Sequence, residues 1–143
     1  MKKIILLFVF SISLSINAQE REVKEAIITF FDGMHTSDTL KIKSVCVKDI
    51  LLQSISEGGE KGKLTEGTAE DFYKSIASIP SDMKIEERLL SYKIQIDGTM
   101  AHAWTPYEFY INDKLSHKGV NSFSLFNDNG TWKIVHIIDT RRR

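Results

Sequence analysis

The sequence lacks most of the motifs that reveal a protein's chemistry. Its 143 residues include one cysteine, Cys46, and two prolines, and 19 basic residues balance 19 acidic ones. A lone cysteine excludes an intramolecular disulfide scaffold and is most simply a small buried apolar residue. A C-x-x-C pair, a glycine-rich phosphate loop and a nucleophile elbow are absent. The composition, 42% hydrophobic and 27% charged, indicates one ordinary globular domain.

The first 18 residues have the three parts of a secretory signal peptide. Lys2 and Lys3 form a positive start, an apolar run covers 4–16, and the small residue Ala18 precedes a charged stretch. The run of about 13 residues is shorter than the ~20 that span a bilayer, which disfavours an N-terminal anchor. We therefore expect cleavage near Ala18, export to the periplasm or the medium without a stable membrane anchor, and one mature domain over 19–143.

Charge gives no indication of a nucleic-acid partner. Loss of Lys2 and Lys3 with the signal peptide leaves 17 basic and 19 acidic residues, a balance with no general attraction for polyanions. The basic run 141–143 is the exception. It would either grip an anion or form a solvated tail, and we favour the tail.

Helical spacing dominates the first half of the mature chain. Apolar residues three and four apart over 20–34 predict an amphipathic helix, and a short second helix follows Ser37 or Asp38. After a strand over 49–55 and a glycine-containing loop over 56–63, Thr68 has the position of an N-cap for a third helix. Pro80 ends it.

The second half alternates with period two, which predicts strands. Turn signals at Asp97-Gly98, Asn112-Asp113 and Asn129-Gly130 separate them. The expected strands cover Leu90–Ile96, Met100–Ile111, Leu115–Phe126 and Trp132–Asp139. This order predicts an α+β fold in which N-terminal helices pack on the concave face of a curved antiparallel sheet and enclose a cone-shaped cavity.

Two-residue turns at 112–113 and 129–130 would fix which side chains share the cavity face. Under that register Glu108 lies opposite His117, and Phe123 lies opposite His136. Pro106 suggests a bulge, which leaves the directions of Trp104 and Tyr107 open. The predicted cavity face comprises Glu108, Tyr110, His117, Asn121, Phe123, Leu125, Trp132, Ile134 and His136.

These residues support two kinds of chemistry. A carboxylate beside an imidazole, as in Glu108 and His117, would form a general base, with a tyrosine hydroxyl at a developing oxyanion. The alternative for the pair is a structural cross-strand contact at the cavity rim. The expected ligand-binding residues are Trp104, Tyr107, Tyr110, His117, Asn121 and His136, which offer stacking surfaces together with donors and acceptors.

Other sites are disfavoured. The four histidines have no compact ligand spacing, so we expect no metal, and no cofactor motif is present. An acidic pair deep in the sheet is also not expected, because Asp97 and Asp113 belong to turns and Asp139 to a strand end. That argues against isomerase chemistry.

The element order and length resemble the nuclear transport factor 2-like superfamily, which includes ketosteroid isomerases and polyketide cyclases. Three stretches resemble a small exported bacterial branch labelled "putative lumazine-binding": Trp104-Thr105-Pro106-Tyr107-Glu108-Phe109-Tyr110, His117-Lys118-Gly119-Val120-Asn121-Ser122-Phe123 and Trp132-Lys133-Ile134. The resemblance covers essentially the whole mature chain and implies a homodimer formed through the sheet.

The favoured hypothesis is an exported, non-catalytic protein that binds a small hydrophobic or heterocyclic molecule. The alternative is a cofactor-free isomerase, cyclase or dehydratase that uses the Glu108–His117 pair. The predicted register also places apolar side chains on the outer sheet face, where they would form the dimer interface. Those side chains are Tyr107, Phe109, Val120, Val135 and Ile137.

Overall fold

The computed structural model describes the backbone of residues 2–59 and 61–143, and side chains from Asn17 onward within those ranges. Residues 1–16 of the predicted signal peptide therefore lie outside the described side chains. The described part of the chain contains three helices: α1 (Lys2–His35), α2 (Thr39–Ser44) and α3 (Ala69–Ala77). Among the side chains described, no helix combines the length and apolar character needed to cross a membrane.

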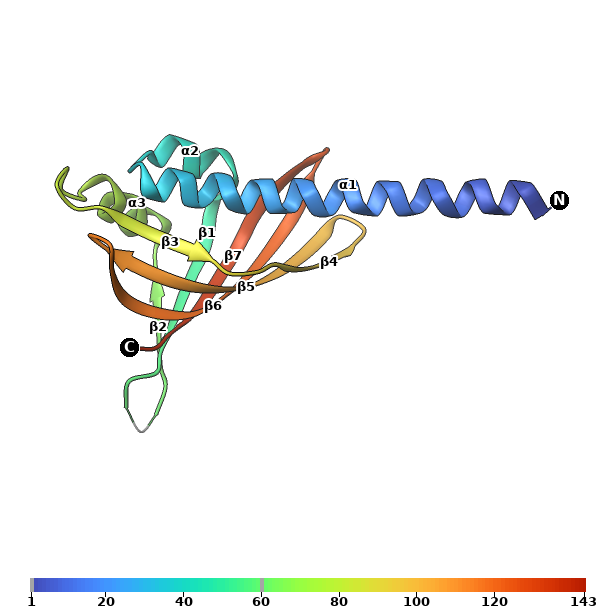
Figure 1. The fold of residues 1–143 in the computed structure, drawn as a ribbon. Helices are drawn as coiled ribbons and strands as arrows, with labels where there is room; N and C mark the ends of the chain where they lie inside the picture. The colour runs from blue at the N-terminus through green and yellow to red at the C-terminus, as the bar shows by residue number, and fades with distance from the viewer. Residues whose placement is uncertain (1, 60) are drawn as a thin grey trace.

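Seven strands form one curved, unclosed sheet beneath the helices (Figure 1). Their order is β2-β1-β7-β6-β5-β3, and β4 also pairs with β5. The pairing of β1 with β7 is parallel and the others are antiparallel, so the sheet is mixed rather than wholly antiparallel. The strands are β1 (Cys46–Ser56), β2 (Lys63–Gly67), β3 (Ile85–Leu89), β4 (Lys93–Asp97), β5 (Met100–Ile111), β6 (Lys114–Asp128) and β7 (Thr131–Arg141).

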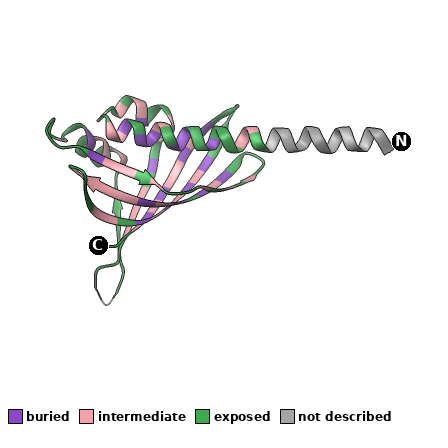
Figure 2. Ribbon diagram, in the orientation of Figure 1, coloured by how far each residue is buried: buried purple, intermediate pink, exposed green. Residues whose placement is uncertain are grey.

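The core lies between α1 and the concave face of the sheet. Val23, Ile27 and Phe30 on one stripe of α1 are buried against sheet residues that include Phe123 and Ile134 (Figure 2). Their spacing of three and four residues is the helical period, which aligns apolar side chains on one face. The predicted α+β cone with helices over the concave face is therefore confirmed.

The helix ends follow the expected chemistry. Asp38 caps α2, since its carboxylate accepts from Lys41 N at 3.0 Å, and Thr68 caps α3 by accepting from Asp71 N at 3.0 Å. Pro80 follows α3, which ends at Ala77. The single cysteine, Cys46, is free and buried, as expected.

Two short strands, β2 and β3, were not predicted from the sequence, and both lie at edges of the sheet. β2 is exposed along its whole length, and β3 contains the charged stretch 86–88. Pro106 is tolerated in β5 because it faces the gap between β3 and β4, where its carbonyl accepts from Leu90 N at 2.8 Å.

Two bulges set the directions of the side chains in the long hairpins. The turns behave as predicted, since Ile111 pairs with Lys114 and Tyr110 with Leu115. The register then shifts by one at Ser116, so that His117 pairs with Phe109 and not with Glu108. In the next hairpin an equivalent shift at Val135 pairs Phe123 with Ile137 instead of His136. Each shift exchanges the faces of the residues beyond it.

Candidate functional site

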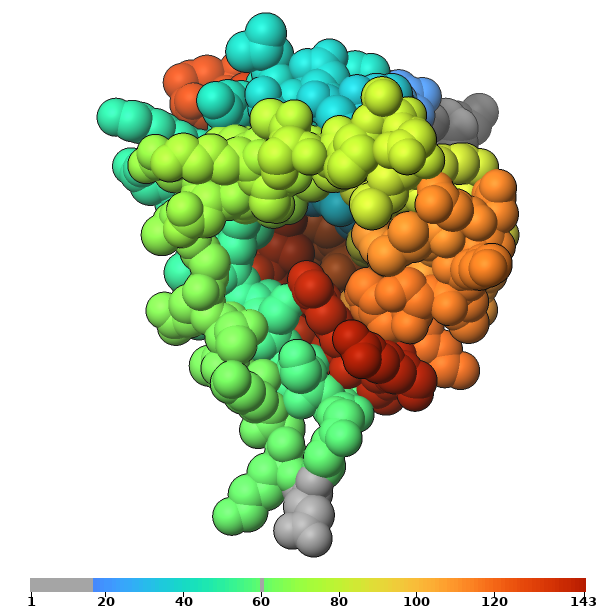
Figure 3. Space-filling view, turned by 90° about the vertical axis from the view of Figure 1, so that its left-hand side faces the viewer, coloured from blue at the N-terminus to red at the C-terminus, as the bar shows by residue number. Residues whose placement is uncertain are grey.

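The concave face and the helices enclose an open cavity of about 690 Å³. In Figure 3 it appears as a hollow bounded by the segments of β2 and α3, by the ends of β5 and β6, and by the C-terminal strand. Its lining comes from α1, α3 and six strands, which brings together residues 30 to 141 of the chain. The cavity lies at the place predicted for the cone.

Apolar side chains from the helices, most of them aromatic, form one side of the cavity, which we call the helix wall: Phe30 and Phe31 of α1, with Phe72 and Ile76 of α3. The rings of Phe30 and Phe72 are parallel with centroids 5.8 Å apart. Phe30 also meets Phe31 edge-on at 5.3 Å. Such contacts add about 0.5–1.5 kcal/mol per pair beyond area burial.

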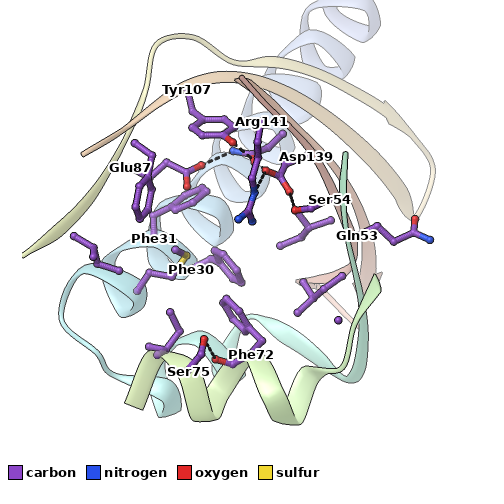
Figure 4. A pocket seen from close by; sticks show the side chains of 18 of the residues that line it. Phe30, Phe31, Gln53, Ser54, Phe72, Ser75, Glu87, Tyr107, Asp139 and Arg141 are labelled. Atoms are coloured by element: carbon purple, nitrogen blue, oxygen red, sulfur yellow. Dashed lines mark hydrogen bonds and ion pairs between the residues drawn. The ribbon is translucent and has the colours of Figure 1, made fainter. Parts of the chain in front are cut away.

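The strands on the facing side carry a polar cluster, which we call the sheet wall: Glu87, Tyr107, Asn121, Asp139 and Arg141. Figure 4 shows Glu87, Tyr107, Asp139 and Arg141 of this cluster. Apolar strand residues, among them Phe109, Ile111 and Ile137, line the cavity beside it.

Asp139 is the centre of the sheet wall. Its side chain is 8% exposed and accepts hydrogen bonds from three residues on three strands. Ser54 of β1 donates to Oδ1, while Tyr107 Oη and Arg141 Nε each reach Oδ2, at 2.9 and 2.8 Å. Tyr107 Oη also lies 2.9 Å from Thr140 O. Burial, followed by the charge of Asp139, raises the pKa of Tyr107, so the phenol keeps its proton.

Glu87 is the second carboxyl group of the sheet wall. Asn121 Nδ2 donates to its Oε1 at 2.7 Å, and Asn121 is itself 4% exposed. Desolvation raises the pKa of Glu87 to about 7, with Asp139 adding to the rise and the Asn121 hydrogen bond opposing it. A carboxyl group with a pKa near neutrality can both accept and donate a proton.

His35 fixes the backbone of Glu87 from the helix side. Its Nε2 accepts from Glu87 N at 2.9 Å, which requires the neutral ring with its proton on Nδ1. Burial lowers the pKa of His35 and so favours this form. His35 is thus a positioning residue that links the end of α1 to β3.

The sequence-predicted site residues divide into two groups. Tyr107, His117 and Asn121 line the cavity. The His117 ring stacks on Phe109 at 4.8 Å and meets Tyr107 edge-on at 5.8 Å. Burial of the imidazole, followed by the positive charge of Arg141, lowers the pKa of His117.

The prediction that Glu108 and His117 lie opposite each other is wrong. Because of the bulge at Ser116, Glu108 lies opposite Lys118 and points to the other face of the sheet. Its Oε2 accepts from Tyr110 Oη at 2.7 Å, and Arg88 lies 4.0 Å over the Tyr110 ring. Neither Glu108 nor Tyr110 lines the cavity.

Trp104 and His136 also lie away from the cavity. Trp104 is 46% exposed on the convex face, and His136 Nε2 lies 3.0 Å from Gln53 Oε1. Conversely, Tyr107, Phe109 and Ile137 line the cavity rather than the outer face on which the predicted register put them. The two bulges account for these exchanges.

Sequence reasoning missed three residues that line the cavity. Glu87 lies in a strand without an apolar alternation signal, and Asp139 and Arg141 were assigned to a strand end and a tail. A faint signal existed for the last two: their i, i+2 spacing places both on one face of a strand that continues past Ile138. The expectation that no acidic pair lies within the sheet is therefore wrong.

Comparison with solved structures shows which fold this chain shares with other proteins. An NTF2-like protein of unknown function from Shewanella baltica matches with a TM-score of 0.66 at 18% identity, over 88% of this chain and 95% of that one. A Streptomyces avermitilis protein described as a "putative dehydratase" of the NTF2-like family matches with 0.68 at 14%, over 89% and 98%. The β subunit of a "putative aromatic-ring-hydroxylating dioxygenase" from Novosphingobium aromaticivorans gives 0.71 at 10%, over 90% and 92%.

These likenesses identify the fold as that of the nuclear transport factor 2-like superfamily, in agreement with the resemblance seen in the sequence. Within it, the chain belongs to the family described as "Putative lumazine-binding", whose model matches residues 18–137. No curated protein matches the chain. Among the described residues, no group of three or more His, Cys, Asp or Glu side chains is placed to bind a metal ion.

Proposed function

We propose that this protein binds a small apolar or heterocyclic molecule in the cone-shaped cavity. The observation that carries the proposal is the pairing of an aromatic helix wall with a polar sheet wall across about 690 Å³ of open space. Ligand sites of small molecules combine an apolar lining with a few convergent polar groups in this way. Membership of a family described as lumazine-binding supports a heterocyclic ligand.

A fluorescence titration with the neutral aromatic probe N-phenyl-1-naphthylamine tests this function. We expect saturable enhancement with the intact protein, and a loss of about tenfold or more in affinity for Ser75→Trp, which fills the cavity from α3. Lys74→Trp, at an exposed neighbouring position that does not line this cavity, is the matched control and should bind normally. Absence of binding, or equal binding by Ser75→Trp, would contradict the proposal.

A second candidate function is proton transfer without a cofactor, favoured by the cavity-facing Glu87 whose pKa is about 7. Here Glu87 would act as the base on a carbonyl compound, with Asn121 orienting its carboxyl group. The S. avermitilis neighbour described as a "putative dehydratase" supports such chemistry on this fold.

Deuterium exchange at the α-carbon of 2-tetralone, followed by NMR, tests this second function. Acceleration that disappears in Glu87→Gln and persists in Glu86→Gln would establish the base. Exchange at the uncatalysed rate would leave the protein as a binder only.

The convex face supports a homodimer through the sheet, although with different residues from those first expected. Met100 and Phe126 form a cross-strand pair with 60% and 46% of their surfaces exposed, and Trp104 lies on the same face. Sedimentation velocity should show a dimer that Trp104→Glu converts to a monomer. Leu40→Glu, at an exposed position on α2, is the control and should leave the dimer intact.

We also propose export, which the charged, apolar and small-residue segments of 1–18 support. Intact-mass measurement of the protein recovered from its native cell should give a chain that begins at Gln19. A chain that retains residues 1–18 would contradict cleavage.

A further inference from the structure

We propose that the cavity takes an organic anion: a planar apolar body carrying one anionic group, which the guanidinium of Arg141 binds. The inference rests on the small-molecule-binding function proposed above and adds the chemical class of the ligand. It follows from the unused hydrogen-bonding groups of the sheet wall, from their charges, and from the shape of the opposite wall.

Arg141 has donors to spare. Its Nε is used by Asp139 Oδ2 at 2.8 Å, but among the described residues its two Nη groups have no hydrogen-bond partner. The side chain is 53% exposed, and Figure 4 shows the guanidinium directed into the open space between the walls. A planar guanidinium with two free N–H groups on one edge matches the two oxygens of a carboxylate or a similar anion.

Asp139 holds Arg141 in place and has little capacity left for a ligand. Both of its oxygens already accept from protein donors, namely Ser54 on one side and Tyr107 with Arg141 on the other. The carboxylate is also buried, whereas the guanidinium reaches the cavity. The pair therefore presents its positive end to a ligand.

Glu87 does not oppose an anion as an ordinary carboxylate would. The groups that face it are Asn121 from β6, Asp139 and Arg141 from β7, and the Tyr107 hydroxyl from β5, while His35 from α1 binds its backbone N–H. In these surroundings the carboxyl group takes up a proton near neutrality. In that form it contributes an O–H donor rather than a negative charge.

The helix wall determines the rest of the ligand. Phe30, Phe31 and Phe72 offer ring faces and edges but no hydrogen-bonding group. A ligand that reaches from Arg141 to these rings has an anionic group at one end and a flat apolar body at the other.

A matched pair of fluorescent probes separates the two ends. The anion 8-anilino-1-naphthalenesulfonate and neutral N-phenyl-1-naphthylamine share one ring skeleton and differ in the sulfonate. We expect Arg141→Gln to lower the affinity for the anionic probe by about tenfold or more. The affinity for the neutral probe should fall by less than about twofold. Ser75→Trp should abolish binding of both, which locates the anion in the cavity.

Two further variants keep the test decisive. Arg142→Gln removes a neighbouring positive charge that pairs with Glu57 and does not line the cavity, so it should change neither probe. Because Arg141→Gln leaves Asp139 without its ion pair, the double variant D139N/R141Q removes both charges together. It should show the same selective loss of the anionic probe.

The outcomes distinguish this inference from the function on which it rests. If neither probe binds the unaltered protein, both are wrong. If the neutral probe binds, two results overturn the anion inference alone. One is that the anionic probe keeps its affinity in both R141Q and D139N/R141Q. The other is that Arg142→Gln lowers the affinity for the anionic probe as much as Arg141→Gln does.

Discussion

The two walls of the cavity are held in different ways. The helix wall consists of side chains such as Phe30 and Phe72 that contact one another through ring faces and edges. The sheet wall consists of polar groups fixed by directional hydrogen bonds, most of which join different strands, while Arg141 bonds to Asp139 within β7. Dispersion and hydrophobic contacts tolerate small shifts, whereas hydrogen bonds weaken steeply with angle.

This difference indicates a division of labour. The helix wall contributes most to stability, because aromatic burial is worth several kilocalories per side chain. The sheet wall determines which ligand groups are accepted, because its donors and acceptors are few and fixed. Substitutions in the two walls should therefore have separable effects.

Truncation of the helix wall should give the largest loss of stability. Phe30 is 3% exposed and contacts Phe31, Phe72 and Phe123, so Phe30→Ala leaves a void in the core. We expect the free energy of unfolding in urea to fall by about 4 kcal/mol. Leu40→Ala, at a position on α2 that is 76% exposed, is the control and should cost less than about 1 kcal/mol. Similar losses for both variants would contradict the assigned core.

The strands that carry the sheet wall should be most sensitive to substitution at a glycine. A Cβ added at Gly119 would lie 1.7 Å from Thr140 O, the same carbonyl that Tyr107 approaches. Gly119→Ala must push β6 away from β7, and we expect a loss of about 3 kcal/mol in urea unfolding. Gly67→Ala, where a Cβ meets nothing within 4 Å, should change stability by less than about 1 kcal/mol. A tolerated Gly119→Ala would show that the two strands are less closely packed.

The same contrast explains how much the sequence could predict. The apolar period of residues 23–31 determines one face of α1 directly, so the helix wall and the cone followed from local pattern. The long hairpins were also predictable, because their turns contain Asn112-Asp113 and Asn129-Gly130.

The sheet wall could not be predicted because it depends on non-local pairing. No sequence pattern indicates the bulges at Ser116 and Val135. Because of them, Tyr107 and Ile137 lie on the concave face in place of the predicted Glu108 and His136. Asp139 becomes buried only because β1 pairs in parallel with β7 and brings Ser54 to it.

The charge on the sheet wall can be titrated. Burial raises the pKa of Glu87 from 4.5 to about 7, so the folded protein holds this proton more tightly than the unfolded chain. The stability gained from the proton is complete below about pH 4.5 and is lost as the pH rises through about 7. The glutamine in Glu87→Gln cannot ionise. The free energy of unfolding of this variant, relative to that of the unaltered protein, should therefore rise by about 2 kcal/mol from about pH 5 to about pH 8.

Urea unfolding at several pH values measures this effect. Glu86→Gln is a suitable control, because Glu86 is the neighbouring carboxyl group on β3 and its pKa is lowered by hydrogen bonds from Arg88. Its removal should not produce a gain with rising pH. An identical pH dependence in both variants would show that Glu87 titrates as an ordinary surface carboxyl group.

The smallest effect should come from a buried hydroxyl on the same face of the sheet as the sheet wall. Thr105 pairs with Asn121 across β5 and β6 and is fully buried, yet among the described residues its hydroxyl has no hydrogen-bond partner. Thr105→Val keeps the shape and removes an unpaired polar group, so urea unfolding should show a gain of about 1 kcal/mol. Thr140→Val is the opposite case: its hydroxyl accepts from Val120 N at 3.1 Å, and its loss should cost about 1 kcal/mol. If both variants lose stability, the Thr105 hydroxyl makes a favourable interaction, and the polar cluster of the sheet wall extends along β5 to Thr105.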